Sequence, residues 1–547
     1  MSRPQVESSE IDAVVVGAGF SGLYMLHRLR TLGFNARIIE AAEGVGGTWY
    51  WNRYPGASCD SESHYYCYSF SDEVRKEWKW SCRYPAQPEI LDYLNFVADR
   101  LDLKKDIEFG TRVTAGNFDE ETHSWVIETD RGETVRARFL ITGAGNTSTP
   151  NKPAIPGLDN FEGAIYHTAL WPHEKVDFTG QRVGLIGTGS SGIQSTPFIA
   201  KEAKHLTVFQ RTANYSVPAR NHPLTHEMRR DQEDNFEELR RLTLASPIGM
   251  PFEVPQNSAL DVSPEERKRR YDELWAVGGF RFMFTAYNDL VLNLESSNTA
   301  ADYISARIRD TVQDPTVADI LCDFNHPAGT KRPPIDTNYY ETFNRDNVAI
   351  VSVRTNPFRE ATNDGLTLAN GDHYQLDSIV FATGFDTVTG TLIKLNLRGK
   401  GGISLTEKWQ DGPRAYLGLC SAGFPNLFMI TGPGTPGILT NFPVCIEQNV
   451  DWIANVMTRM RETNAVEIEA SVDAESQWVR EIAEVADKTL FPTIDSWYMN
   501  SNLPGKPRVF TAYFSGMSTY AEVCANVAEN NYAGFEIRSR ELAEAAA

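Results

Sequence analysis

The chain has 547 residues, 41% of them hydrophobic and 23% charged, and its formal net charge is −20. This length exceeds what one hydrophobic core organises, so we expect roughly two to four domains. The acidic balance argues against nucleic acid and anionic membranes as partners, because phosphate groups attract basic surfaces. No apolar run approaches about 18 residues, so we expect no membrane-spanning helix.

The seven cysteines are scattered and form no C-x-x-C pair. This pattern is typical of reduced thiols in a cytoplasmic protein, and it indicates neither a disulfide framework nor a zinc site. The polar, acidic N-terminus MSRPQVESSEID does not resemble a signal or transit peptide. We therefore expect a cytoplasmic protein without a bound metal.

The first nucleotide-binding signature lies in residues 11–40. A β-branched apolar run, IDAVVV, predicts a buried strand, and it leads into GAGFSG, with Gly17, Gly19 and Gly22, and then into an amphipathic helix. The next predicted strand, NARIIE, ends on Glu40. Such glycines let the backbone approach a pyrophosphate, and an acid at Glu40 can accept hydrogen bonds from ribose hydroxyls.

The acid also limits the choice of cofactor. Glu40 would repel a 2′-phosphate, so this site suits FAD or NAD and not NADP. The glycine- and aromatic-rich run 43–60 can wrap a large planar cofactor, which favours flavin, and Asp60 and Tyr66 follow as polar groups in an aromatic setting. Residues from about 80 to 103 then read as helical. Alternating residues from 108 to 141 predict a small β-meander.

A second signature, QRVGLIGTGSSG, repeats the strand and glycine pattern at Gly187, Gly189 and Gly192. The strand after its helix, HLTVFQRT, ends on Arg211 instead of an acid. An arginine at this position is the expected partner of the 2′-phosphate of NADP. Two dinucleotide sites with opposite charge at the ribose end imply FAD together with NADPH.

Between the two signatures lies the segment FEGAIYHTALWPH, residues 161–173. It predicts neither a good helix nor a good strand, because it begins near a glycine and ends on Trp171 and Pro172. It is either a linker whose aromatic residues pack against two domains or a segment that coordinates them. We expect His167 to have a structural or conformational role and not a catalytic one.

The later residues divide by composition. Residues 223–328 are charged, helical and poor in glycine, and Lys331 and Arg332 follow in a loop bounded by proline and glycine. Such a basic pair often only faces solvent, but beside an NADP site it is a candidate for anion binding. The α/β pattern predicts two Rossmann-like dinucleotide-binding domains with a helical insertion. Their expected ranges are 1–145 and 384–547 (FAD), 146–222 and 329–383 (NADP), and 223–328 (insertion).

The segment FEGAIYHTALWP fits F-x-G-x-x-x-H-x-x-x-W-[P/D], and the chain resembles the type I Baeyer–Villiger monooxygenases. The similarity extends over nearly the whole chain, through GGTWYWNRYPGA, IGTGSSG, TVFQRT, GTKRP, ATGFD, and SWY followed by N-x-P-G-K. The resemblance implies NADPH- and O2-dependent oxidation of ketones to esters or lactones through a flavin peroxide. The family's members include enzymes for phenylacetone, steroids, cyclohexanone and cyclopentanone.

The resemblance also assigns residues. It makes Arg332 the active-site arginine and Asp60 the acid that hydrogen-bonds it, and it places Trp497 near the nicotinamide half of NADP. The FAD-binding set is expected to be Gly17, Gly19, Phe20, Ser21, Gly22, Glu40, Gly47, Thr48, Trp49, Trp51, Asp60, Tyr66 and Val113. The NADP-binding set is expected to be Gly187, Thr188, Gly189, Ser190, Ser191, Gly192, Gln194, Arg211, Thr212, Lys331, Arg332 and Trp497. The expected substrate pocket includes Gly437, Ile438 and Leu439.

Other functions compete with this one. A flavin-containing monooxygenase that oxidises N or S atoms shares both nucleotide signatures, but its linker has Tyr or Phe where this chain has Trp171 and Pro172. A non-catalytic flavin or NADP sensor would keep the signatures without needing Arg332. A disulfide reductase is excluded, since it requires a redox cysteine pair.

The substrate itself is not predicted. The run GGFRFMF, residues 278–284, resembles the branch that oxidises cyclic ketones, whereas TGPGTPGILTN, residues 431–441, resembles the phenylacetone and steroid branch. The expected partners are a small ketone and O2, and of the possible oligomeric states a monomer is favoured.

Overall fold

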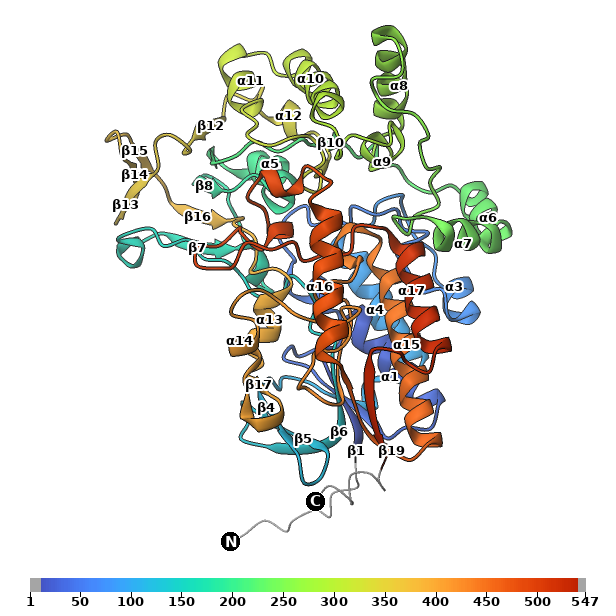
Figure 1. Ribbon diagram of the computed structural model, residues 1–547. Helices are drawn as coiled ribbons and strands as arrows, with labels where there is room; N and C mark the ends of the chain where they lie inside the picture. Colours follow the sequence, from blue (N-terminus) through green and yellow to red (C-terminus); the bar gives the residue numbers. More distant parts are fainter. Residues whose placement is uncertain (1–10, 540–547) are drawn as a thin grey trace.

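The computed structural model describes residues 11–539. It has the predicted α/β fold, with two sheets that each contain a parallel Rossmann-like core (Figure 1). The first sheet lies in the lower half of the view, and the second sheet lies above it, next to a group of helices. The N-terminal segment and most of the alanine-rich tail lie outside the described residues. None of the helices in residues 11–539 combines the length and the continuous apolar sequence that a membrane span requires.

The first sheet has a parallel part and an antiparallel part. Its strand order is β17-β4-β5-β6-β1-β2-β3, with β18 beside β6. The strands are β1 (Ile11–Val16), β2 (Ala36–Ile39), β3 (Ile107–Glu108), β4 (Val113–Asp119), β5 (Ser124–Thr129), β6 (Thr134–Thr142), β17 (Leu397–Arg398) and β18 (Leu427–Met429). The predicted meander is the antiparallel run β4-β5-β6, and β6 then pairs in parallel with β1. The interior of β1 is fully buried, as its apolar sequence requires.

The second sheet is entirely parallel, in the order β12-β9-β8-β16-β7. Its strands are β7 (Ala164–His167), β8 (Arg182–Ile186), β9 (His205–Gln210), β12 (Val348–Ser352) and β16 (Ser378–Phe381). The assignment of 161–173 as neither helix nor strand was wrong for β7, a short edge strand that pairs only with β16. Four residues are too few for a periodic pattern, and two of them are exposed, so the apolar signal of a buried strand is absent.

Close packing explains one glycine in each signature. A Cβ on Gly22 would stand 1.8 Å from the carbonyl oxygen of Gly17, and one on Gly192 would stand 2.0 Å from that of Gly187. Each glycine lies in the first turn of a helix, α1 (Phe20–Thr31) or α5 (Ser190–Glu202), that packs directly on the preceding turn. Any larger residue would push the helix away from its strand, which agrees with the role expected for the last glycine of the motif.

Helices fill most of the interval 223–328. They are α6 (His226–Asp234), α7 (Phe236–Ala245), α8 (Pro264–Val277), α9 (Arg281–Thr285), α10 (Leu294–Thr311) and α11 (Pro315–Leu321). Figure 1 shows α8, α10 and α11 above the second sheet, whereas α6 and α7 lie lower, at the right of the view. A small antiparallel sheet follows, with β13 (Phe358–Thr362), β14 (Gly365–Leu368) and β15 (His373–Gln375).

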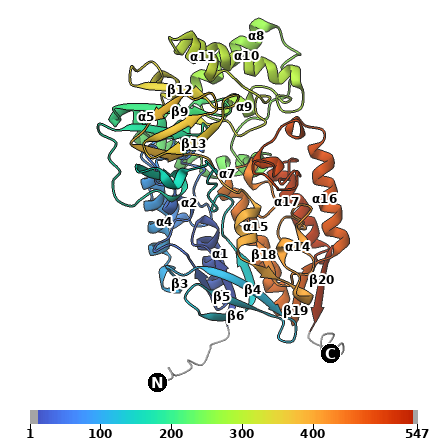
Figure 2. The ribbon, with the colours of Figure 1, turned by 90° about the vertical axis from the view of Figure 1, so that its left-hand side faces the viewer.

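The C-terminal residues return to the first sheet. Helix α15 (Phe442–Glu462) packs on α1, and the Tyr24 hydroxyl donates to Asp451 at 2.8 Å. Figure 2 shows α15 grouped with α14 (Leu405–Lys408), α16 (Val472–Ala486) and α17 (Met517–Glu529) beside this sheet. The helix expected over 80–103 is shorter: α4 spans Gln87–Arg100, with a proline in its first turn. Proline is favoured in the first turn of a helix and disrupts a helix interior, so the helix begins next to Pro88 and not near residue 80.

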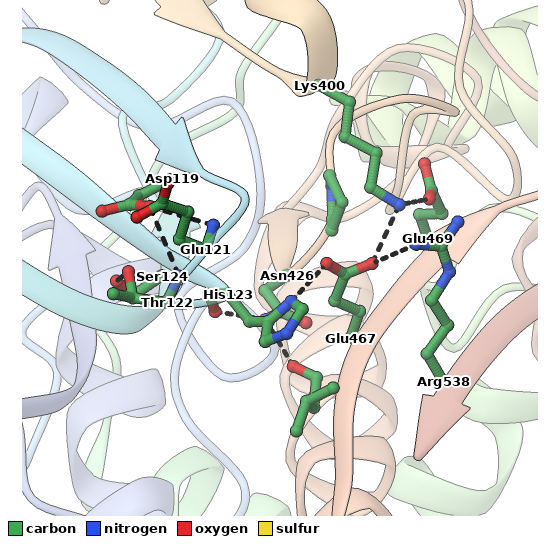
Figure 3. Close-up of polar contacts among 12 residues, drawn as sticks. Asp119, Glu121, Thr122, His123, Ser124, Lys400, Asn426, Glu467, Glu469 and Arg538 are labelled. Carbon is green, nitrogen blue, oxygen red and sulfur yellow. Dashed lines mark hydrogen bonds and ion pairs between the residues drawn. The ribbon is translucent and has the colours of Figure 1, made fainter. Parts of the chain in front are cut away.

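A buried ion cluster ties the C-terminal hairpin to the first sheet (Figure 3). The hairpin is β19 (Ala465–Ala470) with β20 (Phe535–Ser539). The Glu467 side chain, 2% exposed, forms an ion pair with Nζ of Lys400 at 2.8 Å and contacts Nδ1 of His123 at 2.7 Å and Arg538 at 3.5 Å. Burial alone would raise the pKa of Glu467, but Lys400 and His123 outweigh it and lower the pKa. The carboxylate is therefore held in its charged form.

We expect Glu467→Gln to lower the free energy of unfolding by about 1–3 kcal/mol at pH 7, because Lys400 and His123 lose a charged partner in a buried site. A lowered pKa in the folded state contributes stability above the unfolded pKa and loses it as pH falls through the folded pKa. The difference between variant and wild type should therefore shrink below about pH 4. Denaturant unfolding at pH 7 and at acid pH measures both effects. Glu536→Gln, on the exposed face of β20, is the control and should change little.

Candidate functional site

The first glycine loop is held by Glu40. The backbone N–H of Ala18 donates to Oε2 at 2.5 Å, and that of Ala42 donates to Oε1 at 2.7 Å. Burial raises the pKa of Glu40, while these two hydrogen bonds act in the opposite direction. The carboxylate therefore fixes the loop after β1 and still has lone pairs for a ribose, since an ionised carboxyl group accepts about four hydrogen bonds.

An aromatic wall follows this loop. The indole N–H of Trp49, in α2 (Thr48–Trp51), donates to the Tyr66 hydroxyl at 3.2 Å. The Phe20 ring lies 5.2 Å from that of Tyr66 in an edge-to-face arrangement. Most of the expected FAD-binding residues are thus close together, on the glycine loop, the start of α1 and α2. Val113 lies apart from them in the chain, buried at the start of β4.

The second glycine loop is tied to the end of β9. The Thr188 hydroxyl donates to the carbonyl oxygen of Thr212 at 2.7 Å, which brings the loop beside Arg211. A Cβ on Gly189 would meet no atom within 4 Å, so this side of the loop is open. Ser190 and Ser191 begin α5 next to that opening. An open glycine turn at a helix N-terminus fits a phosphate group.

Gln194 lies between the two dinucleotide units. Its Oε1 accepts the Tyr54 hydroxyl at 2.8 Å, and its Nε2 donates to the Ser58 carbonyl oxygen at 3.1 Å. The side chain thus links α5 to the loop 54–58 of the first unit. The sequence placed Gln194 only among the NADP-binding residues, so its contacts with Tyr54 and Ser58 were not expected.

Lys331 and Arg211 form a pair of cations near the end of β9. Burial and the charge of Arg211 lower the pKa of Lys331 to about 8, while Asp495 acts in the opposite direction. The loop is fixed locally, because the Thr330 hydroxyl donates to the carbonyl oxygen of Pro327 at 2.6 Å. Two cations that repel each other are stabilised by an anion between them, so this pair suits a phosphate group.

Arg332 and Asp60 form the central contact of the site. Nε of Arg332 donates to Oδ2 at 2.6 Å and Nη2 donates to Oδ1 at 3.0 Å, a bidentate ion pair across 272 residues of sequence. The guanidinium also lies 4.5 Å from the centre of the Phe280 ring. Burial opposes the charge of Arg332, but Asp60 outweighs burial and raises its pKa further. The arginine is permanently protonated.

A second ion cluster supports Phe280. Glu62 accepts Nη2 of Arg83 at 2.9 Å and also pairs with Arg281, the residue after Phe280. Burial would raise the pKa of Glu62, but the two arginines outweigh it and lower the pKa. Burial lowers the pKa of His64, 3.8 Å from Glu62, to about 4, so this histidine is neutral. The cluster joins the loop after Asp60 to α9 and was missed, because its members are far apart in sequence.

The opening between the units is a cavity of about 110 Å³, lined by residues that include Thr48, Asn52, Thr147 and Ser191. Several buried polar atoms in segments around the site have no hydrogen-bond partner: Nδ2 of Asn146, Oγ1 of Thr440, Oδ1 of Asn441 and Oγ of Ser496. Such orphaned atoms are rare in folded proteins unless a ligand or water satisfies them. The residues present therefore fit bound dinucleotides.

His167 contacts both segments through which the chain passes between the two sheets, one after β6 and one after β16. Its Nδ1 accepts the N–H of Ala169 at 3.0 Å, so the proton lies on Nε2, which donates to the carbonyl oxygen of Asn151 at 3.1 Å. Thr383 contacts the same Nε2 at 3.4 Å. Burial lowers the pKa of His167, so the ring is neutral at pH 7. Both ring nitrogens of His167 are thus engaged in contacts within the protein, which fits a structural role.

The loop 496–508 carries Trp497 and is fastened by Lys506. Trp497 stacks on Tyr498, with ring centres 4.1 Å apart, and Tyr498 is buried beside Arg332. Nζ of Lys506 pairs with Asp386 and donates to the Thr389 hydroxyl at 2.8 Å. In the sequence, Lys506 and Asp386 belong to two separate runs, GK and ATGFD. Their contact is visible only in the folded chain.

The expected substrate loop forms a short 3₁₀ turn, Gly437–Leu439, directly before α15. Gly437 and Ile438 are buried, and Leu439 is partly buried against the core of the first unit. Asn441, the residue before α15, donates from Nδ2 to the carbonyl oxygen of Tyr65 at 2.7 Å. The loop is thus held against the segment that follows Asp60.

Comparison with known proteins gives the family. The profile described as "Pyridine nucleotide-disulphide oxidoreductase" matches residues 14–277. A Baeyer–Villiger monooxygenase of Pseudooceanicola batsensis is 43% identical, over 97% of both chains, and cyclohexanone 1,2-monooxygenase of Acinetobacter sp is 40% identical, over 97% of both chains. The chain belongs to the Baeyer–Villiger monooxygenase family. The disulfide chemistry in the profile's description needs a redox cysteine pair, and the seven cysteines of this chain include no C-x-x-C pair.

Solved structures agree with this placement. A steroid monooxygenase bound to NADP is 49% identical, with a TM-score of 0.93 over 97% of this chain and 100% of that chain. A protein named OTEMO, solved in complex with FAD and NADP, is 38% identical with a TM-score of 0.94 over 97% of this chain and 100% of that chain. The prediction of FAD and NADP as cofactors is confirmed at the level of the family.

One relative acts on nitrogen. Phenazine N-monooxygenase PhzNO1 of Lysobacter antibioticus is 42% identical over 97% of this chain and 98% of its own. Relatives that are about 40% identical to this chain therefore include enzymes named for ketones and one enzyme named for N-oxidation. Membership of this monooxygenase family does not by itself fix the oxidised atom.

We expect Lys506→Met to loosen the loop 496–508, because Asp386 loses its cation in a largely buried contact. Limited proteolysis within the loop should accelerate about tenfold, and the KM for NADPH should rise more than kcat falls. Lys506→Arg should restore most of both properties. Lys488→Met, an exposed lysine outside the loop, is the control. Unchanged proteolysis together with an unchanged KM in Lys506→Met would show that this contact does not position the loop.

Proposed function

We propose that the protein oxidises ketones to esters or lactones with NADPH and O2. The observation that carries this proposal is the bidentate Arg332–Asp60 pair, which stands between the two dinucleotide-binding units beside the paired cations of the second one. A permanently charged guanidinium in this place can stabilise an oxyanion that forms on a carbonyl substrate.

The two cofactors are expected on opposite sides of this pair. Glu40, the first glycine loop and the Trp49–Tyr66 wall would hold FAD, and the second glycine loop with Arg211 and Lys331 would hold NADPH. When bound, FAD accepts a hydride equivalent from NADPH and makes dioxygen reactive toward a ketone. The protein's own contribution is to place the ketone and to stabilise charge.

Arg332 can act on the substrate while it remains attached to Asp60. Asp60 occupies Nε and Nη2, and a guanidinium has five N–H donors, so Nη1 remains for a substrate oxygen. Phe280 covers the guanidinium and limits its contact with water, which strengthens its field at the reacting carbonyl. Asp60 holds the orientation of the arginine and does not need to exchange a proton.

N-oxidation is the second candidate function, and the 42% identity to a phenazine N-monooxygenase favours it. The two activities differ in product: a ketone gives an ester with one inserted oxygen, whereas an aromatic N-heterocycle gives an N-oxide. Incubation with a panel of ketones and N-heterocycles, with product analysis by mass spectrometry, separates them. A sensor without catalysis would oxidise NADPH stoichiometrically and independently of either substrate.

We expect Arg332→Ala to retain reduction of FAD by NADPH but to lose ester formation by at least about 10²-fold, because the developing oxyanion loses its charged donor. Anaerobic stopped-flow measures the reduction, and product analysis measures the ester. Arg359→Ala, an exposed arginine paired with Glu360, is the control. Ester formation at the wild-type rate by Arg332→Ala would contradict the proposed role.

The affinity for NADPH should fall as pH rises through 8. Lys331 has a pKa of about 8 in the free protein, and only its protonated form attracts the 2′-phosphate. The KM for NADPH should rise roughly tenfold between pH 7 and pH 9, since each pH unit above the pKa removes most of the remaining charge. Lys331→Met should show a high KM with a flat profile, and Lys201→Met, an exposed lysine on α5, should retain the wild-type profile. A profile of wild-type steepness in Lys331→Met would exclude Lys331 as its origin.

A further inference from the structure

A second cavity lies apart from the candidate active site. Its volume is about 120 Å³, it is partly open to the surface, and its walls come from the segment 64–80, α4, the first turns of α15, α6 and α7. Neither Arg332, nor Asp60, nor the loop 437–439 lines it. We call it the aromatic pocket, after Trp78, Trp80, Tyr93 and Phe236 in its wall.

The wall of the aromatic pocket is built for an apolar ring. Trp78 and Trp80 pack edge to face with ring centres 5.6 Å apart, and each lies within 5.4 Å of Tyr93. The volume of about 120 Å³ is of the same order as that of an engineered apolar cavity of about 150 Å³ that binds benzene, and this pocket is also open on one side, so its size is compatible with one six-membered ring. The indole N–H of Trp78 is buried and has no hydrogen-bond partner, which leaves one donor unsatisfied in this wall.

The charges around the pocket are unbalanced. The lining contains the cations Arg75, Lys79, Arg229 and Arg240 but only the acids Glu233 and Glu447, and Arg75 pairs with Asp72, which lies outside the lining, at 3.1 Å. His64 adds no charge, because burial lowers its pKa to about 4. The protein as a whole has a net charge of −20, so a local excess of cations is unusual for this surface.

The two acids of the lining already have partners. Glu447 accepts the N–H of Ser69 at 2.6 Å and pairs with Arg240 at 3.4 Å, and Glu233 pairs with Lys79 at 3.3 Å. Arg229 instead donates to a carbonyl oxygen, that of Trp80, at 3.0 Å. A carbonyl leaves the positive charge of Arg229 uncompensated, and most of its N–H donors remain for a ligand.

We propose that the aromatic pocket binds a compact apolar carboxylate, with its ring against Trp78, Trp80 and Tyr93 and its carboxylate at the guanidinium of Arg229. The apolar wall accounts for the ring, and the excess of cations accounts for the acid. The site goes beyond the oxidation proposed above, since a carboxylate is neither the ketone nor a cofactor.

Calorimetric titration of the FAD-loaded enzyme with cyclohexanecarboxylate, in the presence of saturating NADP+, tests this site. NADP+ covers the cations expected at the nucleotide site, so binding there by the carboxylate is suppressed. We expect one bound carboxylate per chain, and cyclohexanecarboxamide, which has the same shape without the charge, should bind at least about tenfold more weakly. Equal affinity for the two compounds, or no binding at about 10 mM, would overturn the proposal.

Variants locate the bound molecule. Arg229→Met should weaken binding of the carboxylate about tenfold or more, whereas Arg230→Met, the next residue on α6 and fully outside the pocket lining, should bind like wild type. Trp78→Phe keeps a ring but removes the unpartnered donor and should weaken binding less. Thr243→Trp, which fills the pocket from α7, should abolish it. Binding that is unchanged in both Arg229→Met and Thr243→Trp would place the carboxylate elsewhere and refute the site.

Discussion

The ion pair between Arg332 and Asp60 is the constraint on which the candidate site depends. It joins a loop that follows the helical insertion to a loop that follows the first glycine signature, 272 residues earlier. A largely buried pair gains little net stability, because desolvation offsets most of the Coulomb attraction. Its effect is instead geometric: two parallel hydrogen bonds fix the plane of the guanidinium, and with it the direction of its remaining donors.

Other buried polar contacts also hold the segments around the Arg332–Asp60 pair together. Glu62 connects Arg83 with Arg281 and so holds Phe280 over Arg332, Gln194 ties α5 to loop 54–58, and Lys506 fastens the loop of Trp497. The contacts of Gln194 with Tyr54 and of Lys506 with Asp386 join segments that are more than 100 residues apart in the sequence. Because buried polar groups are costly when unpaired, such contacts favour one relative position of the segments over slightly shifted ones.

Local requirements made most of the fold predictable from sequence. A strand, a glycine turn and a helix must follow one another within about 20 residues to hold a dinucleotide, so both signatures and the charges of Glu40 and Arg211 were visible in the chain. The Arg332–Asp60 pair was not, and only the family resemblance pointed to it. The Glu62 cluster and the Lys506–Asp386 contact went unnoticed, because nothing within a short window of sequence records which distant segments meet. Strand β7 was missed because four half-exposed residues carry no periodic signal.

The position of His167 gives the family fingerprint a physical reason. The chain crosses between the two units twice, once after β6 and once after β16, and these connections run side by side: the N–H of Asn151 donates to the carbonyl oxygen of Gly384 at 2.9 Å. The neutral ring of His167 contacts both, through the carbonyl oxygen of Asn151 and the hydroxyl of Thr383. The second connection leads directly to Asp386 and therefore to Lys506 and the loop of Trp497. A histidine that joins both crossings can couple the relative position of the units to that loop, which is a mechanical role and needs no proton transfer.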